Sequence, residues 1–74
     1  MNTSEKLYAA MRRNANDWSL QDLQTVARRR LITWHHHGSH CIFTRSDGEA
    51  LSVPAHRTVK PVYVKQFVLF VEGK

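Results

Sequence analysis

Residues 32–45 constrain the fold more than any other stretch, because they place a tight turn between two extended runs. Residues 32–37 and residues 40–45 each alternate side chains with the period of two that is typical of a β-strand. Gly38 and Ser39 lie between the two runs, and such a pair favours a tight reversal of the chain. We therefore predict that the two runs pair as an antiparallel hairpin.

A third strand is predicted directly after this hairpin. The Asp47-Gly48 pair is a strong hairpin signal, and residues 50–53 follow it as a short apolar and polar alternation. Pro54 then closes the strand, because proline has no N–H to donate to a ladder, and we expect residues 55–60 to form a basic loop. The three runs together predict an antiparallel meander.

Two helices are expected before the sheet. Thr3 or Ser4 can cap the first, which runs to about Arg13, and the polar residues 14–17 end it. The second begins after Ser19, which has capping-box spacing to Asp22, while Trp18 and Leu23 have the spacing of a hydrophobic staple. Its expected buried stripe consists of Leu20, Leu23, Val26 and Ala27.

Residues 61–72 allow two interpretations. Their β-branched and aromatic content favours a strand. The spacing of Val64, Phe67, Val68 and Val71 favours a helix, as does Pro61 at the first helical position. The residues alone leave both structures open.

The charge of the chain favours a polyanionic partner. Eleven Lys and Arg against six Asp and Glu give a formal net charge of +5, which suits nucleic acid, an anionic membrane surface or an acidic protein. Residues 1–5 do not resemble a signal peptide, and no apolar run approaches the roughly 20 residues that span a bilayer. With a single cysteine, Cys41, we expect a cytoplasmic protein that does not associate with membranes.

Four of the five histidines lie within residues 35–40. Imidazole both takes and gives a proton near neutral pH, so this stretch suits acid-base catalysis, and it also suits metal binding. A metal site would use His35 and His37, which share a strand face, with His40 or Cys41. We favour acid-base chemistry, because consecutive strand residues point to opposite faces.

Three motifs in order carry a resemblance to a known family. They are Gly-Ser-His at residues 38–40 with Ile-Phe at 42–43, the Asp-Gly turn at 47–48, and Leu-Ser-Val-Pro-Ala-His at 51–56. Together they resemble the HicA family of toxins from bacterial toxin–antitoxin systems. Residues 14–31 are similar to the lead-in helix of longer members, and residues 60–67 to their closing helix. Two positions depart from the family pattern: Cys41 stands where a second histidine is common, and Arg30 stands where many members have a glycine that ends the helix.

The resemblance implies a fold, an activity and a partner. The fold is α+β and similar to a double-stranded-RNA-binding domain, in the order α-α-β-β-β-α, with a three-stranded antiparallel sheet packed against helices. Residues 1–74 would form one domain, in which residues 1–17 add an N-terminal helix to the core, and residues 61–72 would be helical. The activity is that of an endoribonuclease, or mRNA interferase, which cleaves messenger RNA and is neutralised by a HicB-type antitoxin protein.

The resemblance also assigns the site. His40 matches the catalytic histidine, Gly38 is the glycine that lets the backbone turn beside it, and Ser39 completes the turn. Cleavage of RNA without a metal requires deprotonation of a 2′-OH and protonation of the leaving 5′-oxygen, and one imidazole can assist either step. We expect no metal and no small-molecule cofactor, since the stretch has neither a nearby carboxylate for Mg²⁺ nor paired thiolates for zinc.

Cations near His40 would stabilise the charge of the transition state or hold the RNA. Arg28, Arg29 and Arg30 are equally well interpreted as the solvated end of the second helix. Trp34 and Phe43 are interpreted as core residues rather than as platforms on which bases stack. An RNA-binding module of the same fold that does not cleave remains the alternative. The candidate RNA contacts are Arg28, Arg29, Arg30, His37, Arg45, His56, Arg57 and Lys60.

Overall fold

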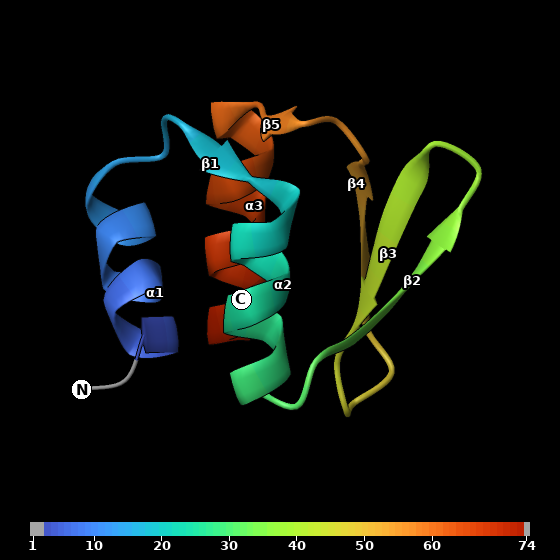
Figure 1. The fold of residues 1–74 in the computed structure, drawn as a ribbon. Helices are drawn as coiled ribbons and strands as arrows, with labels where there is room; N and C mark the ends of the chain where they lie inside the picture. Colours follow the sequence, from blue (N-terminus) through green and yellow to red (C-terminus); the bar gives the residue numbers. More distant parts are fainter. Residues whose placement is uncertain (1–2, 74) are drawn as a thin grey trace.

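The computed structural model describes residues 3–73, and within that range the chain forms three helices, a three-stranded sheet and a two-stranded ladder (Figure 1). The predicted α+β class with a three-stranded antiparallel sheet is confirmed. The elements in order are α1 (Thr3–Arg13), β1 (Trp18–Ser19), α2 (Leu20–Arg29), β2 (Thr33–His37), β3 (His40–Thr44), β4 (Ala50–Pro54), β5 (Thr58–Val59) and α3 (Pro61–Glu72).

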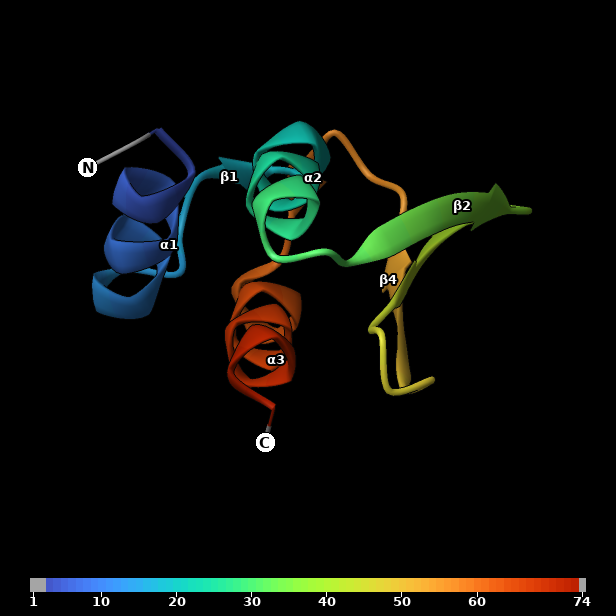
Figure 2. The ribbon, with the colours of Figure 1, turned by 90° about the horizontal axis from the view of Figure 1, so that it is seen from below.

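The elements form three layers. Helices α2 and α3 lie side by side against one face of the β2-β3-β4 sheet, and α1 packs on their far side (Figures 1 and 2). None of the helices formed by residues 3–73 lies over the other face of the sheet (Figure 2). Residues on that face are therefore open to solvent.

Each hairpin turn uses a glycine with positive φ. The first turn joins His37 to His40, which are paired across the ladder, and Gly38 has φ 60° at the first central position. That position requires positive φ in the type II′ turns that match the twist of two-residue hairpins. In the second turn the Arg45 N–H donates to the Glu49 carbonyl at 2.8 Å, and Gly48 adopts φ 92°.

The inward face of the sheet supplies one side of the core. Cys41, Phe43 and Val53 are fully buried there, while the residues between them along the strands face outward. The Phe43 ring meets the ring of Phe67 from α3 at 5.1 Å between centroids. The other fully buried large side chains are Met11, Leu23, Val26, Val59 and Val64. The buried spacing in α3 confirms the helical interpretation of residues 61–72.

Helix α2 begins as its sequence predicts. The Asp22 N–H donates to Ser19 Oγ at 3.1 Å, and the Ser19 N–H donates to Asp22 Oδ2 at 3.0 Å, which completes the capping box. Leu23, Val26 and Ala27 are buried. Leu20, the first residue of the predicted stripe, is partly buried against the core.

Helix α2 ends with an unusual residue. The Ile32 N–H donates to the Ala27 carbonyl at 3.0 Å, which is a Schellman-type bond, and Leu31 between them has φ 59°. Glycine is the usual residue at such a left-handed position, because a Cβ costs roughly 1–2 kcal/mol there. The leucine side chain gains little from this conformation, since it is 79% exposed.

Two predictions of local structure were wrong. Residues 55–60 are not a simple loop, because Thr58 and Val59 pair with Ser19 and Trp18 as an antiparallel ladder. A two-residue strand is too short to show a period of two, and Val59 is held mainly by its burial in the core. Thr3 and Ser4 both lie within α1 rather than before it. Assigned helix ends commonly differ by one or two residues.

We predict that Leu31→Gly raises the free energy of unfolding by about 1 kcal/mol, because it relieves the left-handed strain and removes little buried surface. Urea unfolding followed by circular dichroism measures the change. Arg29→Gly, a change at the last residue of α2, is the control and should lower the free energy of unfolding by about 1 kcal/mol. A Leu31→Gly protein no more stable than the parent would show that Leu31 is not strained.

Candidate active site at the β2–β3 turn

His40 is the first residue of β3 and follows the Gly38-Ser39 turn directly. Its side chain is exposed, and it lies opposite His37 across the ladder. Paired residues of an antiparallel ladder carry their side chains on one face, with Cβ atoms about 5 Å apart. Because the next residue, Cys41, points into the core, His37 and His40 both face the open side of the sheet.

The segment after β4 lies against the same turn. Pro54 pairs with His40, and the Ala55 N–H donates to the Ser39 carbonyl at 2.7 Å. The exposed residues His56 and Arg57 follow immediately. The structure therefore brings the 55–57 segment beside the turn that carries His37 and His40.

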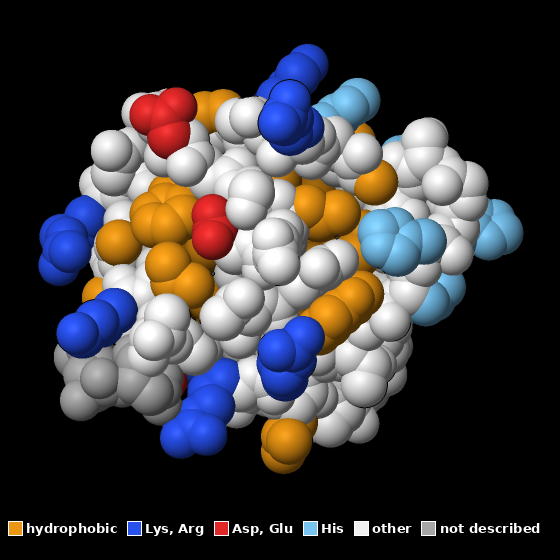
Figure 3. Space-filling view, viewed as in Figure 1, with side chains coloured by type: hydrophobic (Ala, Val, Ile, Leu, Met, Phe, Trp, Pro, Cys, Tyr) orange, Lys and Arg blue, Asp and Glu red, His pale blue; other side chains and the backbone are white. Residues whose placement is uncertain are grey.

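The other candidates near the hairpin do not all lie on the same face of the sheet. Figure 3 shows the histidines gathered over the hairpin, on the side of the molecule away from α1. His35 shares the open face with His37, whereas His36 pairs with Cys41 on the helix side of the sheet and is still exposed. Lys60 is exposed just before α3, one residue beyond β5.

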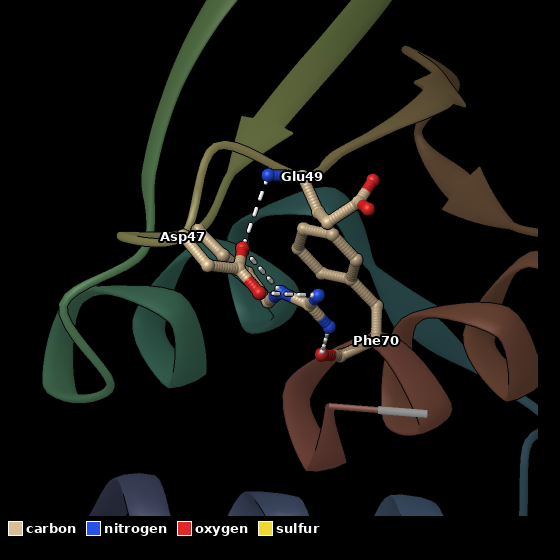
Figure 4. Close-up of polar contacts among 4 residues, drawn as sticks. Asp47, Glu49 and Phe70 are labelled. Carbon is tan, nitrogen blue, oxygen red and sulfur yellow. Dashed lines mark hydrogen bonds and ion pairs between the residues drawn. The ribbon is translucent and has the colours of Figure 1, made fainter.

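Arg45 has a structural role at the opposite end of the sheet. It follows the last residue of β3, so roughly 15 Å of strand separate it from His40. Its guanidinium donates to both carboxylate oxygens of Asp47 at 3.1 and 2.7 Å and to the carbonyl of Phe70 at 3.0 Å (Figure 4). Asp47 Oδ1 also accepts the Glu49 N–H at 3.0 Å. This geometry does not support Arg45 as a cation for chemistry at His40.

The arginines at the end of α2 are also remote from His40. They precede β2, whose four residue steps put roughly 13 Å between its start and His37. Arg30 is occupied by a salt bridge to Glu5 at 3.4 Å and lies 4.5 Å from the Tyr8 ring centroid. Arg28 lies 5.6 Å from the centroid of the Trp34 ring, and Arg29 is exposed. Arg28 and Arg29 are therefore exposed side chains that lie outside the histidine site.

The thiol of Cys41 lies outside the site. Burial raises the pKa of the Cys41 thiol, and the hydrogen bond donated by Gln24 to Sγ at 3.8 Å opposes that rise only in part. The side chain is fully buried on the helix side of the sheet, opposite to His37 and His40. Cys41, one of the two positions at which the chain departs from the HicA pattern, is thus not accessible from the open face of the sheet.

Metal binding has little geometric support. Cys41 points away from the face that carries His35, His37 and His40. Within residues 3–73 no three His, Cys, Asp or Glu side chains are grouped closely enough to hold an ion. Nor does any helix in this part of the chain have the length and apolar character needed to cross a membrane.

Comparison of the chain with family profiles, with curated proteins and with solved structures finds no match. The fold and the site define a small α+β domain whose antiparallel sheet carries a histidine pair at one hairpin turn, on its open face. Function is therefore inferred from these residues themselves.

The role of Asp47 was missed at the level of sequence. Its spacing identified the residue only as half of an Asp-Gly turn, yet its carboxylate holds Arg45 against the end of α3 (Figure 4). The two-residue spacing from Arg45 to Asp47 is a local signal for such a pair. The partner carbonyl on Phe70, 25 residues away from Arg45, has no sequence signal.

We predict that Asp47→Asn destabilises the protein at neutral pH and that this difference shrinks in acid. The Arg45 hydrogen bond, then the Glu49 N–H, lower the pKa of Asp47 below its ordinary value of 3.8. A lowered folded pKa gives stability that is complete above the unfolded value and is lost as the pH falls through the folded value. Thermal unfolding of parent and variant at pH 7 and pH 3 measures the difference.

The control for this prediction is the same substitution in an Arg45→Gln background, where Asp47 no longer has its guanidinium partner. There the pH dependence of the difference should be reduced. If Asp47→Asn is equally destabilising at both pH values, the ion pair does not contribute to stability as the geometry indicates.

Proposed function

We propose that this protein is an endoribonuclease similar to the HicA toxins, which cleaves messenger RNA and uses His40 as a general acid or base. One observation carries the proposal. The motif histidine lies exposed at the first position of β3, opposite a second exposed histidine and beside a turn opened by Gly38. A phosphodiester can approach this face because no helix covers it (Figure 2).

The chemistry follows from the paired imidazoles. Attack of a ribose 2′-oxygen on the adjacent phosphorus releases its proton to a base, and the P–O bond to the leaving 5′-oxygen breaks as that oxygen accepts a proton. His40 serves one of these transfers, and His37, on the same face, is placed to serve the other. The exposed side chains of His56 and Arg57 supply positive charge toward the phosphorane oxygens.

The wider assignment follows the same resemblance. The order α2-β2-β3-β4-α3, with both helices on one face of the sheet, is compatible with a double-stranded-RNA-binding-domain-like fold. A HicB-type antitoxin would act by covering the face around residues 38–40, and the net charge of +5 would speed its encounter through an acidic surface. We place both proteins in the cytoplasm.

We predict that His40→Ala lowers RNA cleavage by about 10²- to 10⁴-fold, which is the usual range for loss of general acid-base assistance. Gel analysis of one RNA with equal amounts of parent and variant measures the change. His36→Ala is the matched control, since this neighbouring histidine is exposed on the other side of the sheet, and it should cost far less.

Circular dichroism must show that both variants fold as the parent does. A folded His40→Ala protein that cleaves at the parent rate would place the active site elsewhere. A parent that binds RNA but never cleaves it would favour the alternative of a non-catalytic RNA-binding module.

We further predict that cleavage survives a chelator. The proposed chemistry uses only imidazoles and cationic side chains around the turn, so removal of divalent ions leaves its groups intact. The measurement is cleavage of the same RNA with and without excess EDTA at constant ionic strength. Loss of activity in EDTA that one added metal restores would instead assign a metal to the histidines.

A further inference from the structure

A second candidate site lies where α2 ends and β2 begins. The surface there is hollowed by ≈ 430 Å³, between the last turn of the helix and the first residues of the strand. Figure 3 shows a hydrophobic side chain beside a Lys or Arg side chain over this junction. The residues that line the hollow are Arg28, Leu31, Ile32, Thr33 and Trp34.

Trp34 forms the inner wall. One side of its ring packs on Phe43, with 6.3 Å between centroids. β2 is an edge strand, and the indole is only half-buried, with the Arg28 guanidinium 5.6 Å from its ring centroid.

Leu31 forms the outer wall. It is the most exposed large apolar side chain among the described residues, at 79%, and it stands in the left-handed conformation that glycine would adopt without strain. Backbone strain of this kind persists where surrounding structure enforces it, and it concentrates at functional sites. The chain here holds an apolar side chain out beside a half-exposed aromatic ring.

Arg28 also lines a second hollow of ≈ 440 Å³, whose described lining residues carry only hydroxyl and guanidinium groups. Arg29 and the first turn of α1 border the second hollow, and Ser4 Oγ is buried there with no hydrogen-bond partner in the described part of the chain. The described residues that line it are Thr3, Ser4, Thr25, Arg28 and Arg29, so neither lining includes a carboxylate. Guanidinium groups, hydroxyls and a helix N-terminus together favour an anion.

We propose that the apolar hollow binds a base of single-stranded RNA, stacked on Trp34 and next to Arg28, and that the cationic hollow binds a phosphate of the same strand. A nucleotide joins a flat base with apolar faces to an anionic phosphate. The two hollows are adjacent in the same way, because Arg28 lines both of them. Base stacking on an aromatic side chain and phosphate binding by arginine are the two common contacts of single-stranded nucleic acid.

This inference rests on the proposed function and adds a substrate subsite to it. The hollow lies at the start of β2, roughly 13 Å of strand from His37. RNA that follows the free edge of β2 would therefore place the bound base a few nucleotides from the bond that His40 attacks. The site would then select which RNA segment reaches the histidines.

The test uses His40→Ala protein, so that RNA is bound without being cut, and a labelled single-stranded RNA oligonucleotide. Trp34→Leu should weaken binding about tenfold, since it removes a stacking surface, whereas Trp34→Phe should stay close to the parent. Replacing Arg28 and Arg29 by Ala should reduce the logarithmic salt slope by about 0.7 for each phosphate that the arginines neutralise. Trp18→Leu, the same change at the other tryptophan, should leave binding unchanged.

The outcomes separate this site from the proposed activity. If the parent cleaves RNA and folded Trp34→Leu binds it as tightly as its reference, the subsite is wrong and the endoribonuclease stands. If Trp34→Leu weakens binding but the parent never cleaves, the subsite stands and the endoribonuclease is wrong. Absence of any RNA binding overturns both, and a Trp34→Leu defect confined to association with a second copy or another protein overturns the subsite.

Discussion

The contact between Phe43 and Phe67 joins the two halves of the molecule. Phe43 lies in the middle strand of the sheet, and Phe67 comes from the helix that follows the sheet in sequence. Both rings are fully buried, and tilted aromatic pairs at this separation are favourable beyond the area that they bury. Because so small a chain has only one core, this contact holds the sheet against α3 at its centre.

Much of the fold was predictable because its signals are local. The hairpin at Gly38 and the capping box at Ser19 each depend on residues no more than three positions apart. The β1–β5 ladder was missed because two residues have no periodicity and their partner is about 40 positions away. The left-handed Leu31 was missed for another reason: the sequence expectation placed the helix-ending position at Arg30, and no glycine marks the residue that adopts it.

In the candidate site, too, features set by local sequence could be predicted and features set by tertiary contacts could not. The exposed position of His40 after a tight turn could be predicted, since a turn and an alternating strand determine it. The structural role of Arg45 could not be predicted, because its guanidinium donates to a carbonyl on α3 that only the folded chain brings near. Likewise Trp34 has the place of a core residue in the alternating pattern, and only the structure shows that it lies on an edge strand with its indole half-buried beside Arg28. Residue type and spacing identify groups able to do chemistry, whereas tertiary contacts decide which of them are already engaged.

The alternation of β2 and β3 also determines how the strands align. His35, His37 and His40 face solvent while Cys41 and Phe43 face the helices. A slip of β2 by one residue against the core would turn His35 and His37 toward the helices and would move Trp34 from its contact with Phe43 to the open face. Loss of that contact penalises the wrong alignment. The alternation that leaves His35, His37 and His40 on the open face therefore also keeps the edge strand in its place.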